Sequence, residues 1–237
     1  MRLNKMSISD DEIKRTIRET LGLEEKEGHA TIKEAYVTQA KRYNLATEFL
    51  SEKNKRAHFE LLEGYIDTLN RISIELDVVN REDANANNSE FRSLKIDETY
   101  NLNASFLNAL FFENISDLKS QLVMDSLTFI RLERDFGSFD AWQKDFIACA
   151  MSSRNGWAVT VYNTFLQRYI NVCVDLHNIN VPFASFPIVV LDCSENSYYR
   201  DYLNDRKTYV FAMMKELDWD VIEKRVKKAE KIGKAIK

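Results

Sequence analysis

Apolar residues recur every three or four positions over two long stretches in the first half of this chain. The first stretch runs from residue 52 to 79, a polar loop with the sequence NREDANANNSE follows at 80–90, and the second stretch covers 97–115. Apolar spacing of three to four residues predicts an amphipathic helix. Two such helices joined by a short loop predict an antiparallel helical hairpin. In the first stretch the spaced residues are Phe59, Leu62, Tyr65, Ile66, Leu69, Ile72 and Leu76.

Two capping boxes predict further helices before this hairpin. Ser9 is followed three residues later by Glu12, and Thr31 is followed in the same way by Glu34. In a capping box the hydroxyl and the carboxylate bind backbone N–H groups that the first turn of a helix leaves free. We therefore expect a short helix after the first box and a second helix over 32–50.

The second half of the chain mixes helical and strand patterns. Helical spacing of apolar residues is found over 136–151, 196–217 and 218–237. Short stretches rich in β-branched and aromatic residues are typical of strands. They cover 155–163, 167–177 and 186–193. Helices, a small group of strands and then helices predict an α+β fold.

Composition and charge narrow the picture further. The chain has 237 residues with a formal net charge of -4, and it contains only 6 Gly and 2 Pro. The acidic balance argues against a protein whose whole surface binds nucleic acid. No apolar run approaches the roughly 20 residues that span a bilayer, so we predict no membrane insertion. Three widely spaced cysteines predict reduced, mostly buried thiols in a non-secreted protein: Cys149, Cys173 and Cys193.

Four separated motifs occur in the order found in a known enzyme family. The stretch LDCSENSYYRDYLNDR at 191–206 aligns without a gap with the family pattern L-D-V-W-E-H-A-Y-Y-x-D-Y-x-N-R-R. Three other segments match the family as well: RDFGSFDAW, NGWAVTVY and DWD. From about residue 50 to 226 the chain resembles the iron/manganese superoxide dismutases. The resemblance implies a helical hairpin followed by a domain with a three-stranded antiparallel sheet and surrounding helices.

We use the resemblance to divide the chain into three parts. Residues 1–50 form an N-terminal helical extension, 51–127 the helical hairpin domain, and 128–237 an α/β C-terminal domain that ends in a basic helix. The first part and the end of the basic helix lie outside the family pattern, so we interpret both as additions to the dismutase core.

The same resemblance locates the metal site. Dismutases of this family hold a redox metal with three histidines and one aspartate. The corresponding positions here are Ala57, Asn108, Asp192 and Asn196, and among them only Asp192 keeps a ligand. His58 follows Ala57 directly, so a shift of one residue in the alignment would add one histidine. Amide oxygens are weak donors to iron and manganese. We therefore predict no metal, no cofactor and no catalysis, and interpret the chain as a pseudoenzyme.

Residues of the dimer interface are better preserved. In the family, the residues at 195 and 199 bind histidines at 196 and 61 of the partner subunit. Glu195 and Tyr199 are present here, but an identical partner would offer Asn196 and Leu61. The resemblance therefore implies a heterodimer with a related, histidine-bearing chain. His177, in the turn DLHNIN, is expected at the surface.

The C-terminal segment VIEKRVKKAEKIGKAIK has two interpretations. It carries seven Lys and Arg residues against two Glu, which suits either a solvated amphipathic helix or a phosphate-binding element. The candidates for binding RNA are Lys224, Arg225, Lys227, Lys228, Lys231 and Lys234.

Together these features are similar to the superoxide dismutase-like proteins of the mitochondrial small ribosomal subunit. We predict a structural subunit of that assembly in the mitochondrial matrix. Its predicted partners are a related dismutase-like chain, other ribosomal or complex subunits, and rRNA through the C-terminal helix. Two alternatives stay open: an active iron/manganese dismutase with altered ligands, and a structural subunit of another mitochondrial complex.

Overall fold

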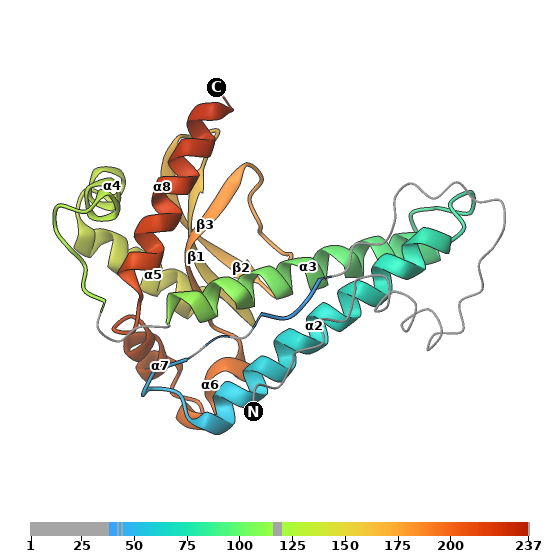
Figure 1. Cartoon of the computed structure of the whole chain (residues 1–237), viewed down its shortest axis with the longest axis horizontal. Coiled ribbons are helices and arrows are strands. Elements are labelled where there is room, and N and C mark those ends of the chain that lie inside the picture. Colours follow the sequence, from blue (N-terminus) through green and yellow to red (C-terminus); the bar gives the residue numbers. More distant parts are fainter. Residues whose placement is uncertain (1–37, 42, 44, 116–119, 237) are drawn as a thin grey trace, which may run out of the picture. The chain divides into compact units, whose positions relative to one another are not determined.

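A computed structural model describes residues 38–41, 43, 45–115 and 120–236 (Figure 1). The chain forms two compact units. One comprises residues 1–40 and 63–102, and the other comprises 41–62 and 103–237. The helix predicted after Ser9 lies outside the described residues. Both long helices pass from one unit into the other. The predicted division into three domains stays a prediction.

The helical hairpin forms as the sequence predicts. Helix α2 covers Glu52–Val78 and helix α3 covers Glu90–Asn114. The hydroxyl of Ser89 accepts a hydrogen bond from the backbone N–H of Arg92 at 3.3 Å, so α3 starts at Glu90 rather than at the predicted residue 97. Where the two helices meet near the loop, they share a small apolar core of Ile72, Leu76, Val79 and Leu94, with Phe91 beside it.

The helix predicted over 32–50 is not formed in its described part. Residues 38–41, 43 and 45–50 contain no helix. The side chain of Asn70 explains this for Thr38. Its Oδ1 accepts a hydrogen bond from the Thr38 N–H at 2.7 Å, and its Nδ2 donates to the Thr38 carbonyl at 2.8 Å. Because a side chain from α2 satisfies both backbone groups, this stretch has less to gain from helical hydrogen bonds.

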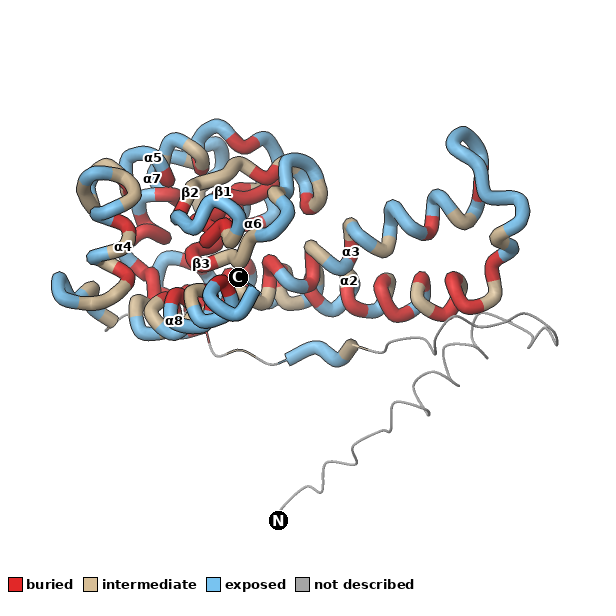
Figure 2. Tube along the Cα trace, turned by 90° about the horizontal axis from the view of Figure 1, so that it is seen from above, coloured by how far each residue is buried: buried red, intermediate tan, exposed pale blue. Residues whose placement is uncertain are grey.

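The second unit is built on a three-stranded antiparallel sheet with the order β2-β1-β3. The strands are β1 (Gly156–Asn163), β2 (Arg168–Asp175) and β3 (Ser185–Asp192). Every residue of the central strand β1 is buried, and Figure 2 shows it in the buried colour. The register shifts between Thr160 and Val161 of β1, opposite β3. Pro187, which has no N–H to donate, lies at this irregularity on an edge strand, where proline is tolerated.

Two helices lie between the hairpin and the sheet in the sequence, and the sequence pattern predicted only the second. Helix α4 covers Leu127–Phe136 and α5 covers Phe139–Ser152. Gly137 separates them with a φ of 87°, a left-handed conformation that glycine adopts without strain. The indole N–H of Trp142 donates to the hydroxyl of Thr160 at 2.9 Å. This buried hydrogen bond fixes α5 on the central strand.

Three helices follow the sheet: α6 (Glu195–Tyr202), α7 (Arg206–Met213) and α8 (Trp219–Ala235). The sequence predicted α6 and α7 as one helix. Leu203 has a φ of 50°, and the carboxylate of Asp205 caps a new helix at the Thr208 N–H, so the helix is interrupted. Within the described part of the chain, no helix is both long and apolar enough to cross a membrane.

Candidate functional site

His58 of α2 and Asp192 at the end of β3 form a buried pair. The two side chains are joined by a hydrogen bond of 2.9 Å between His58 Nε2 and Asp192 Oδ2, and the residues are only 1% and 3% exposed. The second carboxylate oxygen, Oδ1, accepts a hydrogen bond from the backbone N–H of Ser194 at 2.8 Å. Ala57, the predicted ligand position, is only partly buried. The alignment of α2 with the family pattern is therefore shifted by one residue, since the side chain of His58, and not that of Ala57, points to Asp192.

Aromatic side chains surround this histidine. The ring of His58 lies 5.4 Å from the ring of Phe111 and 5.1 Å from that of Phe112, measured between centroids. Phe111 in turn lies 6.3 Å from the ring of Trp157. Nδ1 of His58 is buried and has no hydrogen-bond partner among the described residues. The pair therefore lies in an apolar environment that lowers the local dielectric and strengthens its hydrogen bond.

The two asparagines at predicted ligand positions differ in their surroundings. Asn108 on α3 is 2% exposed, and its Nδ2 donates to the Ala104 carbonyl at 2.8 Å. Its Oδ1 is buried and has no partner within the described part of the chain. Asn196 is exposed on α6. The structure thus buries Asn108 and Asp192 but leaves Asn196 at the surface.

These residues do not fit a centre of three histidines and one aspartate. Across the described ranges, no group of three or more His, Cys, Asp or Glu residues could hold a metal ion. Both carboxylate oxygens of Asp192 already accept hydrogen bonds. Asn108 adds a neutral amide oxygen, which is a weak ligand for iron or manganese. We therefore assign no metal-dependent step to these residues.

His177 was expected at the surface, but it is buried. It is 7% exposed, and its Nδ1 accepts a hydrogen bond from the indole N–H of Trp157 at 3.0 Å. Burial lowers the pKa of His177, and the nearby carboxylate of Asp192 acts in the opposite direction. The short turn DLHNIN gave no signal of this burial, because the contact depends on Trp157 of another strand.

The predicted interface residues lie on the outer side of α6. Glu195 is exposed, and Tyr199 is 53% exposed although it is a large aromatic residue. Their neighbours Ser197 and Tyr198 are buried. The helix is thus fixed to the core by one face and presents Glu195 and Tyr199 on the other.

The basic residues predicted on the last helix fall into two groups. Arg225 is turned inward, where its guanidinium donates hydrogen bonds to the side chains of Asn114 and Glu113 and to two backbone carbonyls. With its side chain only 11% exposed, Arg225 is not available to RNA, so we remove it from the candidate RNA-binding set. The other predicted residues are exposed: Lys224, Lys227, Lys228, Lys231 and Lys234.

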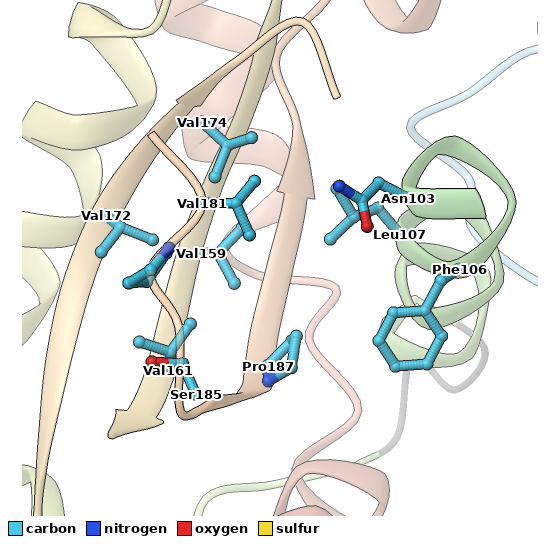
Figure 3. Close-up of a pocket in the computed structure, with 11 residues that line it drawn as sticks. Asn103, Phe106, Leu107, Val159, Val161, Val172, Val174, Val181, Ser185 and Pro187 are labelled. Carbon is cyan, nitrogen blue, oxygen red and sulfur yellow. The ribbon is translucent and has the colours of Figure 1, made fainter. Parts of the chain in front are cut away.

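An apolar pocket of about 170 Å³ lies between α3 and the sheet (Figure 3). Asn103, Phe106 and Leu107 of α3 line one side, and valines of the strands line the other. The lining contains no acid, base or thiol. Its polar lining is limited to the side chains of Asn103 and Ser185.

Comparison with known proteins decides the family. Residues 127–225 match the family described as "Iron/manganese superoxide dismutases, C-terminal domain". The chain is 34% identical over 194 residues to "Superoxide dismutase [Fe]" of Aquifex pyrophilus, which covers 80% of this chain and 90% of the relative. The chain belongs to the iron/manganese superoxide dismutase family.

Two further relatives agree with this assignment. The "Superoxide dismutase [Fe]" of Aquifex aeolicus is 33% identical over 194 residues, covering 80% of this chain and 90% of the relative. The "Superoxide dismutase [Mn] 2" of Halobacterium salinarum is 33% identical over 160 residues, covering 68% of this chain and 78% of the relative. Both the family and the fold class inferred from the sequence motifs are confirmed.

The same comparisons correct the prediction that this dismutase-family chain is not an enzyme. Its curated relatives are named superoxide dismutases, and they share about a third of its residues over most of its length. The prediction of a pseudoenzyme was drawn from substitutions at the family's ligand positions and around them. The relatives contradict it, because they place the chain in a family of enzymes.

Proposed function

We propose that this dismutase-family chain acts as one subunit of a heteromeric assembly and binds a second dismutase-type chain through α6. The observation that carries the proposal is the exposure of Glu195 and Tyr199 on the outer face of that helix. A half-exposed tyrosine beside a carboxylate suits a protein interface, since tyrosine combines an apolar ring with a hydroxyl.

The partner is expected to be a different chain rather than a second copy. In the dismutase family the residues at 195 and 199 bind histidines of the partner at 196 and 61, as the resemblance implies. An identical partner offers Asn196, an amide, and Leu61, which has no hydrogen-bonding side chain. A related chain that carries histidines at these positions would restore both contacts.

The assembly that we propose is the small subunit of the mitochondrial ribosome, which places the chain in the mitochondrial matrix. Two features support this proposal. One is the resemblance to the superoxide dismutase-like proteins of that subunit that we inferred from the sequence motifs, and the other is that α8 exposes five lysines. Other subunits of the assembly would then contact the remaining exposed surface.

Native mass spectrometry of the full chain, purified under mild conditions from mitochondria of its source, tests the pairing. We expect one copy of this chain with one copy of a second dismutase-family chain. Tyr199→Ala should weaken the pair, whereas the matched variant Lys207→Ala, at an exposed position on α7, should not. A stable homodimer in place of the mixed pair contradicts the proposal.

Co-sedimentation tests the assembly separately. The chain should migrate with small-subunit ribosomal RNA through a sucrose gradient, and it should shift to lighter fractions after treatment with ribonuclease. Migration with another large mitochondrial complex, unchanged by ribonuclease, would exclude the ribosome while leaving the pairing intact.

Superoxide dismutation is a second candidate function. The names of the relatives favour it, and so does the retention of a buried histidine beside Asp192. Metal analysis and a dismutation assay on the same purified sample test this candidate. Stoichiometric iron or manganese, with activity that disappears in Asp192→Asn, would support it. Activity without such metal, or metal without activity, would contradict it.

A further inference from the structure

Helix α8 turns Glu223 and Glu230 inward, whereas its third acidic residue, Asp220 in the first turn, is exposed. Glu223 accepts hydrogen bonds from the backbone N–H and the hydroxyl of Thr128, at 2.8 and 2.5 Å, at the start of α4. Glu230 accepts from the guanidinium of Arg131 at 2.5 and 3.2 Å and from the hydroxyl of Tyr169 at 3.3 Å. Both carboxylates are therefore occupied by groups of α4 and β2.

The lysines of the same helix point outward. Lys224, Lys227, Lys228, Lys231 and Lys234 are all exposed. Of these, Lys227 forms an ion pair with Glu223 at 3.1 Å, and its side chain is still 63% exposed. Arg225 is turned into the core by the contacts described above. The outer face of α8 is thus a row of lysines, which we call the lysine face.

The helix that carries the lysine face is firmly held. Its inner residues Ile222, Val226, Ala229 and Gly233 are buried. A Cβ atom added to Gly233 would lie 2.7 Å from Cε1 of Tyr162, so the helix backbone approaches β1 closely at this point. Figure 2 shows buried and exposed residues alternating along α8. Because the inner face of α8 is packed against the sheet, the helix cannot rotate, and the lysines stay on its outer face.

We propose that the lysine face binds the phosphate backbone of RNA. A helix rises about 1.5 Å per residue, so the row from Lys224 to Lys234 extends over roughly 15 Å. Such a linear array of positive charges suits RNA, which has one phosphate for every nucleotide. Lysine contacts phosphate as a compact point charge, and the face contains no arginine, whose planar fork gives two-point contacts. We therefore expect binding that does not depend on base sequence.

This inference rests on the proposed ribosomal assembly for its biological setting, but not on the pairing through α6. Its test uses the purified full chain and no ribosome. If the purified chain does not bind RNA in that test, the proposal that the lysine face binds RNA is wrong. The outcome of the native mass measurement is not affected.

Fluorescence anisotropy with a labelled oligouridine, measured over a range of salt concentrations, gives the number of phosphates neutralised. The slope of log K against log salt is about −0.7 per phosphate for single strands, so five lysines predict a slope of roughly −3.5. The triple variant Lys228→Gln, Lys231→Gln, Lys234→Gln should reduce the slope to about −1.4. At 0.1 M salt the same relation gives about fivefold per contact, and hence about a hundredfold weaker binding.

A second triple variant removes the same charge elsewhere. Lys144, Lys207 and Lys215 are exposed on α5, on α7 and just after α7, and changing them to Gln should leave affinity and slope nearly unchanged. Circular dichroism of both variants checks that they fold. Equal losses in the two variants would assign the effect to net charge and overturn the proposal.

Two other outcomes overturn it as well. One is the absence of RNA binding by the unmodified chain. The other is binding to vesicles of phosphatidylserine and phosphatidylcholine that depends on the lysine face while RNA does not bind. Ile232 and Ile236 are exposed near the end of the helix, so the vesicle measurement is needed to separate a lipid surface from RNA.

Discussion

His58 Nε2 and Asp192 Oδ2 are joined by a buried hydrogen bond of 2.9 Å between residues 134 positions apart in the sequence. The bond connects α2 to the end of β3 within one compact unit. It joins two ligand-type side chains near the ligand positions that the family motifs imply. It also fixes the correct alignment of α2, which the sequence left uncertain by one residue.

We predict that His58→Ala lowers the free energy of unfolding by about 2–4 kcal/mol. The change leaves the buried carboxylate of Asp192 with one partner fewer and opens a cavity between Phe111 and Phe112. Urea unfolding followed by fluorescence measures the difference. The neighbouring variant Ala57→Ser serves as the control and should change stability by less than about 1 kcal/mol. Equal changes in the free energy of unfolding at the two positions would show that the His58–Asp192 pair does not stabilise the protein.

Two glycines in helices should respond in opposite directions to the same change. Nothing lies within 4 Å of a Cβ atom added to Gly64 of α2, whereas one added to Gly233 of α8 lies 2.7 Å from Tyr162. Gly64→Ala should stabilise the protein by about 0.5–1 kcal/mol through helix propensity. Gly233→Ala should destabilise it by about 1–3 kcal/mol, since the buried ring must move. Thermal unfolding of the two variants, compared side by side, gives both signs. Stabilisation by Gly233→Ala would contradict the close contact between α8 and β1.

Glu223 should make the stability of the protein depend on acidic pH. Burial of its carboxyl opposes the shift, but hydrogen bonds from Thr128 and the charge of Lys227 outweigh it, so the pKa lies below its ordinary value of 4.5. A lowered pKa contributes stability that is complete above the ordinary value and is lost as the pH falls through the lowered one. Unfolding measured from neutral pH to pH 3 should therefore show a smaller loss in Glu223→Gln. The exposed Glu133→Gln is the matched control, and it should follow the unmodified chain. Identical curves for all three proteins would rule out this linkage.

Cys149 and Cys193 should react slowly with alkylating reagents while the protein is folded. Burial, with a contribution from Cys173, raises the pKa of Cys149 to about 12. Burial also raises the pKa of Cys193 to about 11. The thiolate is the reactive form, so few of these thiols are reactive near neutral pH. Mass spectrometry after iodoacetamide treatment should show slow labelling at both sites and ordinary labelling in urea. Rapid labelling of Cys149 in the folded state would contradict the structure.

The sequence predicted the parts of the fold that depend on local patterns. The positions of α2 and of the three strands follow from apolar spacing and from β-branched composition. The break between α6 and α7 was missed, because it depends on the backbone at Leu203 and the cap at Asp205. The prediction of a helix over 32–50 was wrong in its described part. There the side chain of Asn70, on α2, binds the backbone N–H and carbonyl of Thr38.

The candidate site was less predictable than the fold. Motif alignment assigned Asp192 and Asn108 to family ligand positions, and the structure buries both, but the alignment could not choose between Ala57 and His58. That choice depends on the phase of α2 against β3, which only the tertiary structure determines. The inward turn of Arg225 was hidden for the same reason, because its partners lie on α3 and β3. Amphipathic spacing alone treated all basic residues of α8 alike.

The most direct test of the account is the composition of the native complex that contains this chain. Native mass spectrometry of the full chain from its source should find a 1:1 complex with a second dismutase-family chain, which Tyr199→Ala dissociates and Lys207→Ala does not. A homodimer that withstands Tyr199→Ala would contradict the account.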